Sequence, residues 1–239
     1  IASMYALKKD IDVFGRMASF FLLPILIFII LDCISLLPSA SLHNIQPILY
    51  NGWSPVLKGA INTISFPLGE IVVFTVIFNS LKEKKEVKST FTKGIIVSSI
   101  ILLLTSTITI LVIGPAVAST YYFPSYVATS RINIGNFFQS IEVILAFMFT
   151  IGGFVNFTIL YLCSAKSISS LFGVDNHRTI IIPLGLLILN FTLLVTESTR
   201  EYFRFTAEIW PYYAIPFQII FPIITLVIAQ IKFRNKQTL

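Results

Sequence analysis

The residues best placed to do chemistry in this chain interrupt its second apolar segment. Val56–Leu81 comprises 26 mostly apolar residues, enough to cross a bilayer, which takes about 20. Its middle reads Ser65-Phe66-Pro67-Leu68-Gly69-Glu70. Proline removes a backbone donor and clashes with the preceding turn, so the helix is predicted to break there. Irregular backbone at this depth must pack in protein or line a cavity, and a carboxylate costs about 2.5–3.5 kcal/mol. Many secondary transporters build a midplane binding site from such a broken span.

Glu70 has two compatible interpretations. It could contact a ligand, an ion or a proton, or pair with a gating residue inside a cavity. It could instead cap the exposed amides of the second half-helix, because acids stabilise helix N-termini. Those amides could also face an anionic group such as a substrate carboxylate. The predicted substrate-binding residues at the break are Ser65, Phe66, Pro67, Leu68, Gly69 and Glu70.

A second set of candidates lies on one face of the fourth apolar segment. The residues at helical spacing are Phe149, Gly152, Gly153, Asn156, Leu160 and Cys163. Glycine and asparagine on one stripe indicate a face against protein. Close helix packing is the simpler interpretation and ligand contact the alternative. On the second interpretation, Gly152 and Asn156 are candidate substrate-binding residues.

The remaining polar residues form no catalytic or metal-binding pattern. Asp32 lies six residues before Pro38, near the expected outer interface, where a carboxylate can reach water. His43 and His177 fall in loops, and neither has a nearby acid and nucleophile. The sequence contains no CxxC, no HExxH and no paired histidines. We therefore expect no enzymatic activity, no metal and no cofactor.

The composition requires that a membrane positions these residues. The chain is 56% hydrophobic and 12% charged, against about 25% charged in a soluble domain. Strand-like alternation is absent, so a membrane barrel is excluded. We expect an all-α transmembrane protein, with residues 1–239 forming a single transmembrane domain. The six predicted spans are Met17–Leu37, Val56–Leu81, Gly94–Val117, Val143–Cys163, Thr179–Val195 and Pro211–Ile231.

The basic residues predict an orientation. Of the 17 lysines and arginines, 13 lie before the first span or after the second, fourth and sixth, and 4 lie on the other side. This distribution predicts that both ends of the chain are cytoplasmic. The net charge of +6 is therefore a topology signal rather than a nucleic-acid-binding patch. The longest outer connection, Ala118–Ile141, suits either an outer lid or interfacial helix or an ordinary loop.

Three features together resemble the spore germination permease family, the B subunit of nutrient germinant receptors. They are the Phe66-Pro67-Leu68-Gly69-Glu70 break, the lysine-rich loop after it, and the outer segment Pro124–Glu142. The resemblance extends from about Asp12 to the C-terminal tail. Two departures stand out, because the family pattern has an acid near Asn136 and an arginine near Ser140. These departures leave the family assignment open and put any salt bridge in that outer loop in doubt.

The resemblance implies the ten-helix, inverted-repeat, LeuT-like fold of the amino acid–polyamine–organocation superfamily. The six spans would correspond to its fifth to tenth helices, with the broken span as the sixth. The chain starts with Ile1 rather than methionine and shows no signal peptide, so we expect it to begin inside a longer protein. On this interpretation the N-terminal half, including the other broken helix, is missing.

These inferences predict the C-terminal part of a permease-like receptor subunit in the spore inner membrane. It would bind a small nutrient, for which an amino acid is the main candidate, and work with other germinant receptor subunits in the lipid bilayer. One alternative is an amino acid transporter, proton-coupled through Glu70. A third possibility is a structural membrane scaffold without a ligand. Nothing in the sequence indicates nucleic acid as a partner.

Overall fold

The computed structural model describes residues 1–9, 11–78, 86–131, 141–195 and 197–234, and the regular secondary structure of this part of the chain consists of helices, without strands. Six helical stretches are long and apolar enough to cross a membrane, as predicted. They are Ile11–Ser39, Ser54–Val76, Val87–Ala118, Val143–Leu171, Arg178–Val195 and Trp210–Lys232. Residues 79–81, at the end of the predicted second span, lie outside the described ranges. Only 6–17% of the most apolar stretch of each span is buried, as a multi-pass membrane protein requires.

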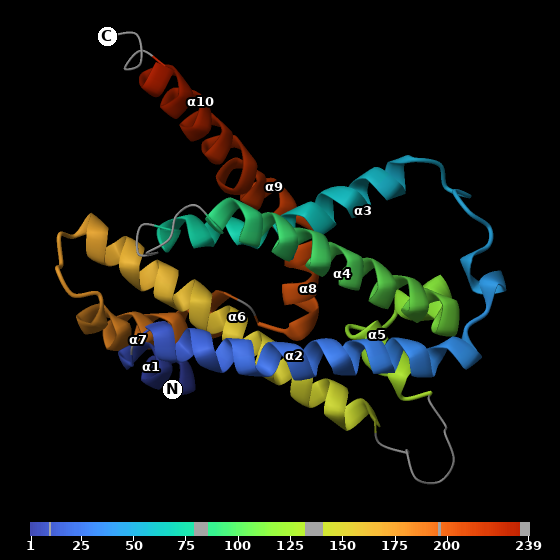
Figure 1. The fold of residues 1–239 in the computed structure, drawn as a ribbon. Helices are drawn as coiled ribbons and strands as arrows, with labels where there is room; N and C mark the ends of the chain where they lie inside the picture. Colours follow the sequence, from blue (N-terminus) through green and yellow to red (C-terminus); the bar gives the residue numbers. More distant parts are fainter. Residues whose placement is uncertain (10, 79–85, 132–140, 196, 235–239) are drawn as a thin grey trace. The chain divides into compact units, whose positions relative to one another are not determined.

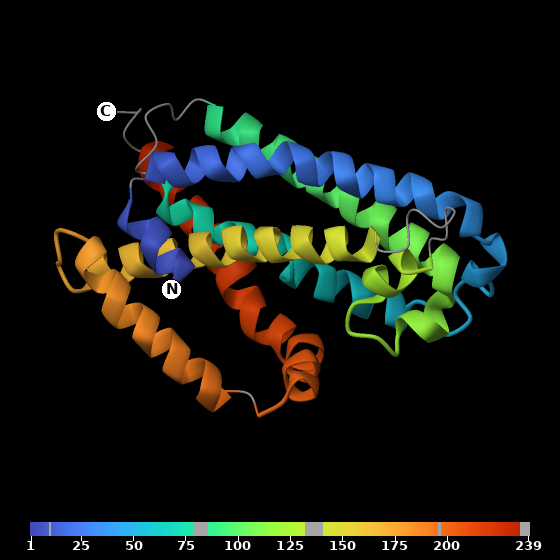
Figure 2. The same cartoon turned by 90° about the horizontal axis from the view of Figure 1, so that it is seen from below.

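The contacts divide the chain into two compact units, which are described separately. Unit 1 comprises residues 1–48 and 85–189, and unit 2 comprises residues 49–84 and 190–239. Unit 1 contains α1 (Ala2–Lys8), α2 (Ile11–Leu36), α4 (Val87–Ala118), α5 (Pro124–Thr129), α6 (Ile141–Leu171) and most of α7 (Arg178–Val195). Within it, α2 and α4 lie side by side, and α7 turns back from the end of α6 (Figures 1 and 2).

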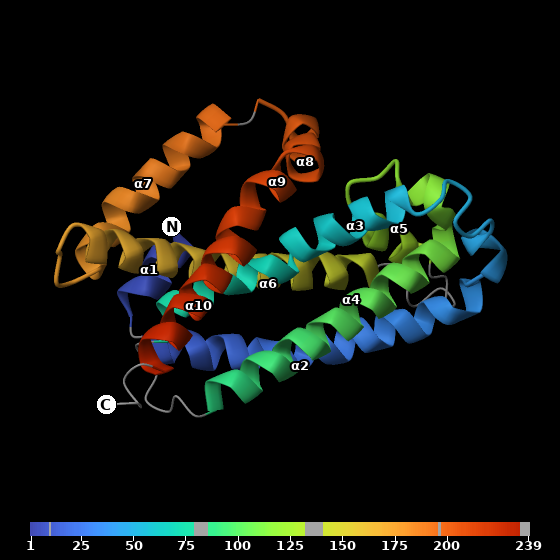
Figure 3. The same ribbon diagram turned by 90° about the horizontal axis from the view of Figure 1, so that it is seen from above.

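Unit 2 contains the interrupted second span and the C-terminal helices. The second span is α3 (Ser54–Ser65) followed by the 3₁₀ helix η3 (Leu68–Val76). The C-terminal part comprises α8 (Thr199–Glu208), α9 (Trp210–Ile215), the π-helical turn η6 (Pro216–Ile220) and α10 (Phe221–Arg234). Figure 3 shows α8 meeting α9 at a sharp bend. In α8, the Ser198 hydroxyl accepts a hydrogen bond from Glu201 N, which is the N-cap that starts this short helix.

A proline in α4 frees a carbonyl that holds the connection following α2 in unit 1. Pro115 has no N–H to donate to the Leu111 carbonyl one turn earlier. Asn44 Nδ2 and Ser41 N donate to that carbonyl instead, at 2.7 and 2.9 Å. Gly114 stands at φ +76°, a conformation that glycine adopts without strain. The buried core beside this kink consists of Leu36, Ile108, Val112, Ile113 and Ala128.

Asp32 is almost fully buried by protein, whereas the sequence indicated a carboxylate within reach of water. Its side chain is 8% exposed, because α5 packs against α2 and places Thr129 over it. The Thr129 hydroxyl lies 3.0 and 3.2 Å from the two carboxylate oxygens and 3.0 Å from the Ser125 carbonyl. The connection between α4 and α6 therefore contains a helix, α5, that covers Asp32. Residues 132–140, where the two departures from the family pattern fall, lie outside the described ranges.

Candidate functional site

The predicted break in the second span is present in unit 2. α3 ends at Ser65, and Phe66 is extended, with φ −149° and ψ 126°. Phe66 N and Ser65 Oγ both donate to the Asn62 carbonyl, each at 2.9 Å, and thereby close the last turn of α3. The Phe66–Pro67 peptide is cis, and η3 begins at Leu68. A 3₁₀ stretch within a span often marks a functional hinge or strained sequence.

Gln218 joins the break from the sixth span. Its Nε2 donates to the Ser65 carbonyl at 2.9 Å, a carbonyl that the end of α3 leaves without a helical partner. Gln218 lies in the π-helical turn η6, a distortion that occurs frequently at functional sites. Its Oε1 is buried and has no hydrogen-bond partner among the described residues. An amide oxygen can accept two hydrogen bonds, so this atom is available to a donor.

Gly69 is the residue that permits this close packing. A Cβ at position 69 would lie 2.7 Å from the Ile64 carbonyl oxygen, and closer still to Oε1 of Gln218. Contacts below 3.0 Å require something to shift, and the Ile64 oxygen belongs to the backbone. Glycine is used where backbone must approach so closely. The structure thus gives a steric reason for glycine at the break.

Glu70 stands in the first turn of η3 and is half-buried. An acid in the first turn of a helix interacts favourably with the exposed amides, as the capping interpretation requires. A half-buried carboxylate beside irregular backbone also suits contact with a ligand or a proton. The two roles remain compatible.

The candidates on α6 belong to unit 1. Gly152 and Asn156 are both exposed, and a Cβ on Gly152 would meet no atom within 4 Å. There is thus room beside Gly152 among the described residues. The structure brings the six residues of the break together in unit 2, and it places Gly152 and Asn156 in unit 1.

Gln218 is absent from the candidates above because a lone glutamine in an apolar span gives only a weak signal in the sequence. The signal that could have drawn attention to it is Pro216, two residues earlier, because a proline inside a span indicates a distortion and Pro216 opens the π-helical turn. Among the described residues, no three His, Cys, Asp or Glu side chains cluster as metal ligands would. The break can therefore supply backbone groups, an amide oxygen and a carboxylate.

The chain is similar to spore germination proteins in two comparisons. Residues 1–200 match the protein family described as "Spore germination protein". The chain is 27% identical over 241 residues to Spore germination protein KB of Bacillus subtilis (strain 168). That alignment covers 99% of this chain and 65% of the relative, so the chain spans less than two thirds of the relative's length. No solved structure matches the chain significantly.

Proposed function

The chain belongs to the spore germination permease family, and from that premise we propose that it senses a nutrient as the permease-like subunit of a germinant receptor. The proposed ligand is an amino acid that binds at the break in the second span. The proposed partners are the other receptor subunits in the spore inner membrane. The six spans are proposed to be the fifth to tenth helices of a LeuT-like fold, within a single transmembrane domain of a longer subunit.

The main observation behind the ligand proposal is the buried Gln218 Oε1 beside the break. An amino acid carries an ammonium group with three donors and a carboxylate that only accepts. The ammonium could donate to Gln218 Oε1, and the carboxylate could face the amides at the start of η3, as in other broken-helix sites. Glu70, in the first turn of η3, would add a negative charge close to the site.

The proposal predicts saturable binding of an amino acid by the complete subunit. Gln218→Met should weaken binding of the identified amino acid about tenfold or more, because a hydrogen bond to a charged group contributes about 1.5–3 kcal/mol. Gln230→Met on α10 is the matched control, since Gln230 is exposed, and it should bind like the natural protein. Equilibrium binding of each labelled amino acid to the purified subunit measures both. Failure of every amino acid to bind would contradict the ligand assignment.

A proton-coupled amino acid transporter is the second candidate, because Glu70 is a carboxylate at a broken span. Receptor and transporter differ in one measurement. Vesicles that contain the complete subunit should accumulate no labelled amino acid if it only senses the nutrient. Accumulation that depends on a proton gradient would favour the transporter.

The basic residues predict the orientation. In a variant that lacks both cysteines, Cys33→Ser and Cys163→Ser, a single Lys88→Cys should resist an impermeant thiol reagent added to intact cells. Arg131→Cys should react, because it lies on the side with few basic residues. Both positions are exposed in the structure, so accessibility reports the side of the membrane. The reverse labelling pattern would overturn the orientation with both ends cytoplasmic.

A further inference from the structure

A small pocket in unit 1 lies where three predicted spans begin or end. Its walls come from α1, the start of α2, the last part of α6 and the start of α7. Ile11 and Arg178 are the first residues of their spans, and the span of α6 ends at Leu171. The pocket therefore lies near the ends of these spans, where lipid headgroups are expected.

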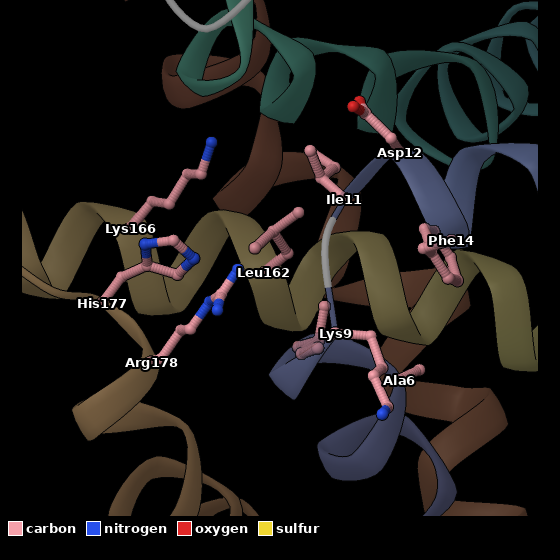
Figure 4. Close-up of a pocket in the computed structure, with 10 residues that line it drawn as sticks. Ala6, Lys9, Ile11, Asp12, Phe14, Leu162, Lys166, His177 and Arg178 are labelled. Carbon is pink, nitrogen blue, oxygen red and sulfur yellow. The ribbon is translucent and has the colours of Figure 1, made fainter.

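One wall of the pocket is cationic. Lys166 on α6 and His177 and Arg178 at the start of α7 lie together on one side, and Asp12 lies on the other (Figure 4). Lys9 also lines the pocket, but its Nζ lies 5.6 Å from the centre of the Tyr5 ring and so stays close to that ring. Asp12 is the single acid among the described residues that line the pocket.

The two cations also act on the imidazole of His177. Burial lowers the pKa of His177 below its usual value, and the charges of Lys166 and Arg178 lower it further. Both cations are thus near enough to disfavour a third positive charge. An anion bound between Lys166 and Arg178 would offset the repulsion among the positive charges.

The other lining residues are apolar. Leu7, Phe14 and Leu162 are buried, and together with Ala6 and Ile11 they form the rest of the wall. The cavity volume is about 170 Å³, below the 300–1,000 Å³ that is typical of pockets for drug-sized ligands. A single phosphate with its nearest carbons is the size that fits, and basic pockets between spans bind anionic headgroups in other membrane proteins.

We propose that this pocket binds the phosphate group of an anionic phospholipid through Lys166 and Arg178. The glycerol carbons would lie against Phe14 and Leu162, and the acyl chains would remain in the bilayer. This site is separate from the proposed nutrient site and does not depend on it. A soluble phosphate ester shares the same chemistry, so the test must distinguish the two sources.

The test is native mass spectrometry of the complete subunit, titrated in detergent with phosphatidylglycerol or phosphatidylcholine. We expect saturable binding of phosphatidylglycerol and at least tenfold weaker binding of phosphatidylcholine, whose quaternary ammonium repels the cationic wall. The Lys166→Gln/Arg178→Gln variant should lose the preference. The Lys88→Gln/Lys93→Gln variant removes the same charge on the same predicted side of the membrane, and it should keep the preference.

Three other results of this experiment would overturn the proposal. An equal loss in both variants would show that overall charge attracts the lipid. Unchanged binding in the pocket variant would place the lipid elsewhere. Glycerol 1-phosphate that binds more tightly than phosphatidylglycerol would identify a soluble ester as the ligand. A second variant applies if the pocket variant does not fold. Lys166→Arg/Arg178→Lys keeps both charges and should bind phosphatidylglycerol with an affinity within about threefold of the natural one, which corresponds to ~0.7 kcal/mol. A loss in that variant also contradicts the proposal.

Discussion

Gly69→Ala is expected to remove most of the nutrient response and to destabilise the subunit by about 1–3 kcal/mol, the usual cost of overpacking. The new Cβ would stand 2.7 Å from the Ile64 carbonyl oxygen and would collide with Gln218 Oε1. Relief requires a backbone shift at Ile64, and Gln218 must move as well. These movements disrupt the hydrogen bond from Gln218 to Ser65. Thermal unfolding of the purified subunit and germination of spores that carry the variant measure the two effects.

Gly59→Ala is the matched control for this change. Gly59 lies in the same helix, α3, and a Cβ there would meet no atom within 4 Å. Alanine is better than glycine in a helix by about 1 kcal/mol, so this variant should be as stable as the natural protein or more stable. Adding Gln218→Ala to Gly69→Ala should recover part of the stability at most, because the backbone contact with Ile64 remains. An undisturbed Gly69→Ala subunit would show that the break is looser than the structure indicates.

The break could be predicted from the sequence because its cause is local. Pro67 and Gly69 act on their own backbone, and an apolar run around them gives the membrane depth without knowledge of any neighbour. The six spans follow from the same kind of information, since length and hydropathy are properties of the segments themselves.

Partners distant in sequence could not be predicted in the same way. Gln218 contacts Ser65 across 153 positions, and Thr129 contacts Asp32 across 97. An isolated glutamine in an apolar span can face lipid, protein or a cavity, and only packing decides between them. Asp32 shows the same limit. Its distance from Pro38 indicated water, whereas the structure places α5 over it. The cationic wall at Lys166, His177 and Arg178 also requires the turn between α6 and α7 to fold.

Glu70→Gln is expected to reduce the nutrient response at least tenfold, with the subunit present at its normal level. The substitution keeps the size of the side chain and a hydrogen-bonding oxygen but removes the negative charge. If Glu70 contacts an ammonium or carries a proton, that charge is the feature on which function depends. If Glu70 only caps η3, glutamine should cost about 0.5–2 kcal/mol at most, and the effect should appear as a lower protein level. Germination rate against nutrient concentration, together with immunoblots of the spore membrane, separates the two cases.

Asp32→Asn is the matched control for Glu70→Gln, because it neutralises another carboxylate within a predicted span. The asparagine oxygen can still accept a hydrogen bond from Thr129, so the contact between α2 and α5 should persist. We expect Asp32→Asn to change the response less than threefold, a difference of about 0.7 kcal/mol. If Glu70→Gln responds like the natural protein at a normal protein level, the Glu70 carboxylate is not part of the proposed site. The buried Gln218 oxygen and the backbone of the break would then be the remaining groups that could hold the nutrient.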